Sequence, residues 1–163
     1  MLYVYLTLFA AAIVALDQWT KALAAAQLAD AANVLIPGWL ELRYTTNDGM
    51  ALSMLSGARW LFVVVGVLFV ALVIWAIAKK HITKKPELWC VAAITGGAIG
   101  NLIDRVATGQ VIDMICVPWF STFNVADIFI TVPAVVLILY ILIFDRGFLS
   151  DKPKKGASHD DPA

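Results

Sequence analysis

The segment LWCVAAITGGAIGNLIDR, residues 88–105, places an apolar helical run directly before a group of polar side chains. Gly96 and Gly100 stand four residues apart, a spacing that lets a second helix approach closely in lipid. Asn101 and Asp104 follow at the end of the run. Polar and ionisable groups in a membrane-spanning segment cost free energy, so their presence indicates a functional site. The segment therefore predicts a membrane-spanning helix that is closely packed by its neighbours and carries chemistry at one end.

Three other stretches are long and apolar enough to cross a bilayer, which takes about 17–25 helical residues. The four predicted spans cover residues 2–23, 60–78, 88–103 and 125–144. The 163-residue chain is 61% hydrophobic and 15% charged, which is unlike soluble domains. We predict one mainly α membrane domain over residues 1–149. A cleaved signal peptide is the alternative interpretation of the first stretch, but the basic residues that open such peptides do not precede it.

The basic residues predict the orientation, because cytoplasmic loops are enriched in Lys and Arg. Of the 12 basic residues, four lie in the loop 79–87 and four in the C-terminal segment; they are Lys79, Lys80, Lys84, Lys85, Arg146, Lys152, Lys154 and Lys155. Both termini are then cytoplasmic, and residues 150–163 form a polar tail expected to be disordered. The region 24–59 and the loop 106–124 face outward. The formal net charge of zero gives no reason to expect a nucleic-acid partner.

The two outer segments contain strand patterns. Leu40, Leu42 and Tyr44 alternate with more polar neighbours, which is typical of a half-buried strand. Residues 111–117 form a second β-rich run. We predict a small extracytoplasmic sheet, a cradle with a peripheral helix or loop. It should rest on the outer membrane surface, with three tryptophans at headgroup depth: Trp39, Trp60 and Trp119.

Ionisable side chains gather at the outer ends of the predicted spans, and they are Asp17, Lys21, Asp104, Arg105, Asp113 and Asp127. Several of them have a structural alternative to a functional role. Asp17 and Lys21 are four residues apart and can form a local ion pair. Asp104 can pair with an arginine. Asn124 and Asp127 have the spacing of a helix N-cap with an acid in the first turn.

The capping interpretation leaves Asp113 unexplained, because this second acid interrupts the apolar run Val111–Val117 and needs a partner or a proton there. Two carboxyl groups held close together share one proton, and such a pair can activate water and protonate a leaving amine. The two cysteines, Cys90 and Cys116, lack metal-ligand spacing and are interpreted as packing residues. A pair formed by Asp113 and Asp127 would therefore need no metal and no other cofactor.

Five motifs in this order resemble those of lipoprotein signal peptidase, or signal peptidase II: Asp17 to Lys21, Asn47 to Ser53, Gly96 to Arg105, Val111 to Asp113, and Phe123 to Asp127. The resemblance implies an intramembrane aspartyl endopeptidase of the bacterial inner membrane. It would cleave lipid-modified prolipoproteins on the N-terminal side of the diacylglyceryl-cysteine, with substrate and membrane lipid as its partners. We expect a monomer.

By the same resemblance, Asp113 and Asp127 are the catalytic pair. The residues that line the site or position substrate are Asn47, Gly97, Asn101, Arg105 and Asn124, and the supporting residues are Asp17, Lys21 and Asp104. The chain departs from the family pattern at Met50, Leu52 and Met114 and in the 14-residue step between the two acids, which suggests a short outer hairpin.

Two other functions use the same residues. A carrier or proton-conducting protein would need polar groups near the bilayer midplane, whereas here they collect at one side. A serine peptidase would combine Ser53 with Lys21, although nothing in the sequence fixes the distance between them. Both remain alternatives at the level of sequence.

Overall fold

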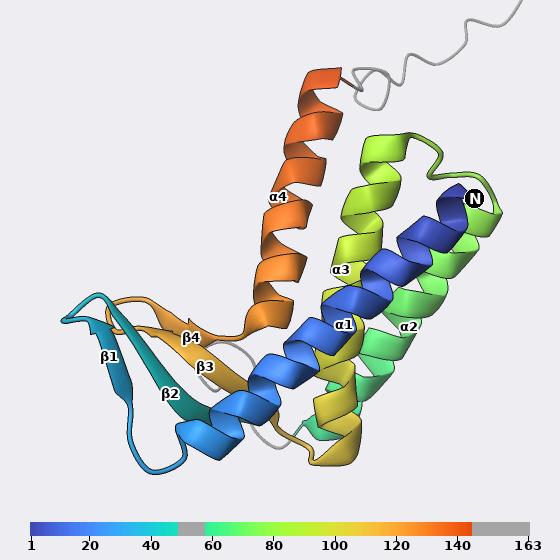
Figure 1. The fold of residues 1–163 in the computed structure, drawn as a ribbon. Helices are drawn as coiled ribbons and strands as arrows, with labels where there is room; N and C mark the ends of the chain where they lie inside the picture. Colours follow the sequence, from blue (N-terminus) through green and yellow to red (C-terminus); the bar gives the residue numbers. More distant parts are fainter. Residues whose placement is uncertain (49–57, 145–163) are drawn as a thin grey trace, which may run out of the picture.

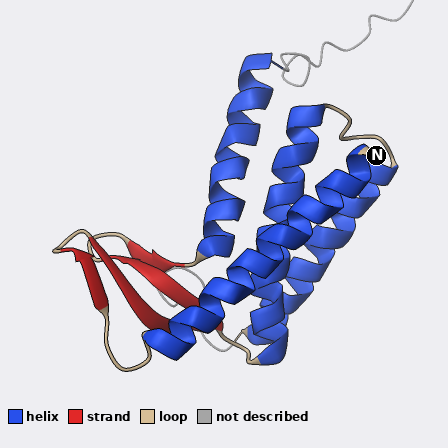
Figure 2. Cartoon of the chain, viewed as in Figure 1, coloured by secondary structure: helices blue, strands red, loops and turns tan. Residues whose placement is uncertain are grey.

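The computed structural model describes residues 1–48 and 58–144, and within them four helices stand on one side of a small antiparallel sheet (Figures 1 and 2). The helices are α1 (Leu2–Gln27), α2 (Arg59–Ala78), α3 (Lys85–Ala107) and α4 (Val125–Phe144). The strands are β1 (Asn33–Ile36), β2 (Leu40–Asn47), β3 (Val111–Val117) and β4 (Ser121–Phe123). Motif residues 49–53 and the expected disordered tail at 150–163 lie outside the described residues.

All four helices are long and apolar enough to cross a membrane, which confirms the four predicted spans. Many large apolar side chains on α2 and α4 are exposed, as expected for surfaces that contact lipid. Two helices extend beyond their predicted spans: α1 continues to Gln27, and α3 runs from Lys85 to Ala107. Hydropathy ended the third span at its polar residues, but the helix continues because those residues find partners inside the protein.

The helix α3 is the centre of the bundle and packs against α1, α2 and α4. Adjacent glycines make two of these contacts possible. A Cβ added at Gly96 would lie 2.9 Å from the carbonyl oxygen of Ala10 in α1. A Cβ added at Gly97 would lie 2.5 Å from the carbonyl oxygen of Ala126 in α4. The two glycines thus let two different helices approach the same turn of α3.

Replacing Gly97 by Ala is expected to lower the melting temperature in detergent, because the backbone of α4 must move to accept the methyl group. Overpacking of this kind costs roughly 1–3 kcal/mol. Gly66→Ala in α2 is the matched control. Its Cβ would meet only the end of the Leu102 side chain, at 3.3 Å. A Gly97→Ala protein that melts at the same temperature as the Gly66→Ala protein would contradict this contact.

The sheet has the strand order β1-β2-β3-β4, with every neighbouring pair antiparallel. The predicted strand at 111–117 is confirmed as β3, and the alternation around residue 42 is confirmed within β2. The short strands β1 and β4 were not predicted. Figure 1 shows the sheet at the end of the bundle where α1 finishes and α4 begins, away from the N-terminus. Trp39, in the turn between β1 and β2, and Trp119, in the turn between β3 and β4, meet edge to face at 5.7 Å, and both are exposed.

Candidate functional site

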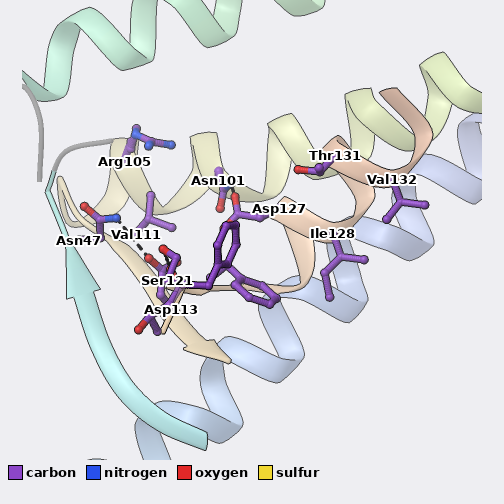
Figure 3. Close-up of a pocket in the computed structure, with 13 residues that line it drawn as sticks. Asn47, Asn101, Arg105, Val111, Asp113, Ser121, Asp127, Ile128, Thr131 and Val132 are labelled. Atoms are coloured by element: carbon purple, nitrogen blue, oxygen red, sulfur yellow. Dashed lines mark hydrogen bonds between the residues drawn. The ribbon is translucent and has the colours of Figure 1, made fainter. Parts of the chain in front are cut away.

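The side chains of Asp113 and Asp127 line one cavity of about 840 Å³ between the sheet and the helices (Figure 3). Asp113 lies in the middle of β3, and Asp127 lies in the first turn of α4. The cavity is also lined by Asn47, Asn101, Arg105, Val111, Phe120, Ser121, Thr122, Phe123, Ile128, Thr131 and Val132. The fold therefore brings together two acids that are 14 residues apart in the chain.

Asn124 connects the two carboxylates. Its side-chain Nδ2 donates to Oδ1 of Asp113 at 2.7 Å, and its backbone N–H donates to Oδ2 of Asp127 at 3.1 Å. The backbone N–H of Asp127 in turn donates to Oδ1 of Asn124 at 2.9 Å. This is the reciprocal arrangement of a capping box, so the capping interpretation is confirmed. The cap also fixes the position of Asp127 at the cavity wall.

The other oxygen of each carboxylate accepts a hydrogen bond from a second asparagine. Asn101 Nδ2 donates to Asp127 Oδ1 at 2.9 Å, and Asn47 Nδ2 donates to Asp113 Oδ2 at 3.2 Å. The second of these bonds is drawn in Figure 3. Three asparagines from β2, α3 and the start of α4 thus hold both acids in place.

Beneath the cavity, Lys21 is the centre of a buried ionic cluster. Its Nζ lies 2.7 Å from Asp17 Oδ2 and 2.8 Å from Asp104 Oδ2, and it donates to Asn101 Oδ1 at 3.0 Å. The predicted pair of Asp17 and Lys21 is confirmed. The proposed arginine partner of Asp104 was wrong, because its ion-pair partner is Lys21. The cause is the packing of α1 on α3, which a sequence spacing does not reveal.

The two acids of this cluster also hold the elements that carry the catalytic candidates. Asp17 Oδ1 accepts the backbone N–H of Ala126, the residue before Asp127, at 2.9 Å. Asp104 Oδ2 accepts the backbone N–H of Ile112, the residue before Asp113, at 3.3 Å. A charge network centred on Lys21 therefore reaches the residue next to each acid of the pair. The other residue of the alternative serine peptidase, Ser53, lies outside the described residues.

Burial and the neighbouring carboxylate of Asp127 raise the pKa of Asp113 to about 6 from its ordinary value of 3.8. The hydrogen bonds from Asn47 and Asn124 and the charge of Lys21 act in the opposite direction and moderate the rise. Asp113 is only 4% exposed, so water does little to stabilise its charge. A carboxyl group in this environment can hold a proton at a pH where an ordinary aspartate has lost it.

This shift predicts a pH-dependent difference in stability between the wild type and Asp113→Asn. The folded protein binds the Asp113 proton more tightly than the unfolded chain does. The resulting stabilisation is complete below about pH 4 and is lost as the pH rises through about 6. Asn does not titrate, so between pH 4 and pH 8 the wild type should lose up to about 3 kcal/mol relative to the variant. Melting temperatures of the wild type and of Asp113→Asn, measured from pH 4 to pH 8, test this prediction.

Thr45→Val, on the strand opposite Asp113, is the control for the pH series, since the substitution removes no titrating group. Its difference from the wild type should be the same at each pH. A difference between the wild type and Asp113→Asn that is equally constant would contradict the raised pKa.

The structure gives the predicted site residues four kinds of position. Five line the cavity: Asn47, Asn101, Arg105, Asp113 and Asp127. Asn124 is fully buried between the acids, and Asp17, Lys21 and Asp104 form the cluster below them. Gly97 lies at the contact between α3 and α4. Within residues 1–48 and 58–144, no group of three His, Cys, Asp or Glu side chains is placed to hold a metal ion.

Several residues of the site were missed from the sequence. Gln18 Nε2 donates to Asp104 Oδ1 at 2.9 Å and to the carbonyl oxygen of Gly100 at 3.1 Å, which adds a further link between α1 and α3. The cavity wall formed by Ile128, Thr131 and Val132 was also missed. Helical periodicity could have revealed this wall, because these positions share a face of α4 with Asp127.

Comparisons with known proteins identify the family of the chain. A family model described as signal peptidase (SPase) II matches residues 9–143. The lipoprotein signal peptidase of Symbiobacterium thermophilum is 39% identical over 139 residues, covering 82% of this chain and 91% of the relative. The lipoprotein signal peptidase of Listeria monocytogenes serotype 4a is 35% identical over 147 residues, covering 87% of this chain and 96% of the relative.

The fold also has solved counterparts. A bacterial membrane enzyme solved by the in meso method at 2.3 Å resolution has a TM-score of 0.79 and 29% identity, covering 93% of this chain and 94% of its own. A second such structure, at 1.9 Å resolution, has a TM-score of 0.76 and 29% identity, and the match covers 86% of this chain and 94% of the solved chain. With the family model and the curated relatives, these matches establish that this multi-pass membrane protein belongs to the signal peptidase II family of lipoprotein-processing peptidases.

Proposed function

We propose that this peptidase cleaves prolipoprotein signal peptides by aspartyl catalysis, with Asp113 and Asp127 acting as one unit. The observation that carries the proposal is the bridging of both carboxylates by Asn124 at the wall of one cavity. Paired carboxyl groups are sufficient to hydrolyse an amide, because one can take a proton from water while the other supplies a proton to the departing nitrogen.

In the proposed mechanism, Asp113 starts protonated. The raised pKa of Asp113 supports this assignment, and Asp127 is the less buried of the two. Asp127 removes a proton from water, and the hydroxide attacks the scissile carbonyl. Asp113 then gives its proton to the leaving amine, so that the pair ends with the proton exchanged between its members.

Arg105, at the cavity wall near both acids, would stabilise the negative charge that develops on the substrate carbonyl oxygen. Its guanidinium group lies over the ring of Phe62 at 4.9 Å, a contact that holds the side chain at the wall. Asn47, Asn101 and Asn124 would position the acids and the substrate. Asp17, Lys21 and Asp104 would support these residues from below, and Gly97 would allow α4 to approach.

The substrate in this proposal is a prolipoprotein with a diacylglyceryl-cysteine, cut on the N-terminal side of that cysteine. The enzyme lies in the bacterial inner membrane as a monomer, with both termini in the cytoplasm and the cavity at the outer face. The placement of Lys79, Lys80, Lys84 and Lys85 between α2 and α3 supports this orientation. The lipid remains in the bilayer while the bond is cut at the membrane surface.

Mass spectrometry of a synthetic lipidated precursor, before and after incubation with the purified protein, tests the reaction and its site. We expect two products, of which the larger begins with the lipid-bearing cysteine. The same precursor without lipid is the control and should be cut at least tenfold more slowly. Cleavage at another bond, or equal cleavage of both precursors, would contradict the proposed substrate.

A further inference from the structure

The strand β4 (Ser121–Phe123) has one edge with no partner strand among the described residues, and the strand borders the cavity of Asp113 and Asp127. Its three residues pair with β3 on one side, through Ile115, Cys116 and Val117. No strand of the described chain pairs with the other side, since β4 is the last strand in the sheet order. All three residues of β4 line the cavity. An unpaired strand edge presents backbone N–H and C=O groups that can bind another extended chain.

The same strand leads directly to the catalytic candidates. Phe123 is followed by Asn124, which contacts both acids, and then by α4 with Asp127 in its first turn. In Figure 1, β4 is the strand that continues into α4. A peptide bound along β4 would therefore have one of its bonds beside Asp113 and Asp127.

We infer that the segment of the substrate that contains the scissile bond binds as an extended strand, antiparallel to β4, as a fifth strand of the sheet. This inference rests on the proposed function, because the occupant is the prolipoprotein itself. Addition of a strand to a sheet edge is a general mode of peptide recognition, in which main-chain hydrogen bonds give affinity. It also exposes the scissile bond, which an α-helix would keep in its own hydrogen-bonded ladder.

The two ends of the cavity fit the two ends of such a strand. Next to α4 the wall is apolar, with Ile128 and Val132 one helical turn apart. At the other end, a second cavity of about 260 Å³ shares Asn47, Asp113, Phe120, Ser121 and Thr122 with the first. Its remaining lining is mainly polar and comes from Arg43, Thr45, Thr46, Asp48, Val117 and Pro118.

The difference between the apolar end and the polar end of the cavity favours the antiparallel direction for the bound peptide. The strand β4 runs toward α4, so an antiparallel partner runs from α4 toward the turn that joins β3 to β4. Its N-terminal part, the apolar signal peptide, then lies along Ile128 and Val132. Its C-terminal part, the start of the mature chain, lies at the polar second cavity, where Arg43 donates to Thr122 Oγ1 at 2.9 Å. A parallel strand would place each part in the wrong environment.

The experiment uses lipidated precursor peptides in which one backbone amide at a time, other than the scissile one, is replaced by an ester. An ester lacks the N–H donor and is otherwise similar in shape. In an antiparallel ladder, successive residues alternate in direction. We expect every second ester within the segment to weaken binding by about 3–10-fold, and the esters between them to have little effect. Affinity for the wild-type enzyme and the cleavage rate are measured separately.

Equal affinity for all esters, or no binding of the parent peptide, would overturn the inference whether or not the peptide is cleaved. Alternating affinity without cleavage would support the inference and would contradict the proposed function instead.

A protein variant gives a second test. Thr122→Pro, which alters the backbone of β4, should raise KM, and Thr122→Ala should change KM less. Leu35→Pro, at the irregular position of the opposite edge strand β1, is the matched control and should leave KM unchanged. Melting temperatures identify any variant that fails to fold.

Discussion

Asp113→Asn and Asp127→Asn are each expected to lower kcat by about 10²–10⁴-fold, because each removes one partner of the proton transfer. The two variants lose different proton-transfer steps. Asp127→Asn loses the group that takes a proton from water, and Asp113→Asn loses the group that protonates the amine. Cleavage of the lipidated precursor, followed by mass spectrometry over hours, measures both.

Asp30→Asn is a suitable control for these variants. Asp30 is exposed between α1 and β1 and lines neither of the two cavities. It should retain kcat within a few-fold of the wild type. Melting temperatures must show that the Asp113 and Asp127 variants remain folded, and a folded variant that cleaves at the wild-type rate would remove that residue from the mechanism.

The second large effect is expected at Lys21. Lys21→Met leaves Asp17 and Asp104 buried without their shared cation, and breaking a buried pair in this way costs roughly 3–5 kcal/mol. The melting temperature in detergent should fall accordingly. Activity should fall as well, for two reasons. Asn101 Oδ1 loses the ammonium group that donates to it. Asp17, which accepts the backbone N–H of Ala126, loses its cation.

Lys84→Met is the matched control for Lys21→Met. Lys84 is 43% exposed and lies 3.6 Å from the carboxylate of Glu87, and ion pairs that are open to solvent contribute at most about 1 kcal/mol. A second substitution, Asp17→Asn in the Lys21→Met background, should recover part of the lost stability because it removes one of the uncompensated charges. Equal melting temperatures for Lys21→Met and Lys84→Met would show that the buried cluster is not a source of stability.

Much of the fold was predictable because it depends on local signals. Runs of apolar residues predicted the four helices, and the alternation around Leu42 and the apolar run at 111–117 predicted β2 and β3. The acids were also identified from the sequence, because a charged group next to a lipid-spanning helix needs an explanation. The structure now places Asp113 and Asp127 at one cavity and joins them through Asn124.

The contacts between elements were not predictable in the same way. The partner of Asp104 was assigned to an arginine, whereas the packing of α1 on α3 brings Lys21 to it. The strand β4 has only three residues, too few to produce a periodic pattern, and it is defined by its pairing with β3. The role of Gln18 depends on the same helix contact. A single sequence records which residues are present, but it does not record which faces of the helices meet.

The central claim is that Asp113 and Asp127 act as one unit in peptide-bond cleavage, and the double variant Asp113→Asn/Asp127→Asn tests it most directly. Residues that act as a unit give strongly non-additive losses of rate. We predict that the double variant cleaves the lipidated precursor within about threefold of the slower single variant. Losses that multiply in the double variant, as they would for two independent groups, would contradict the claim.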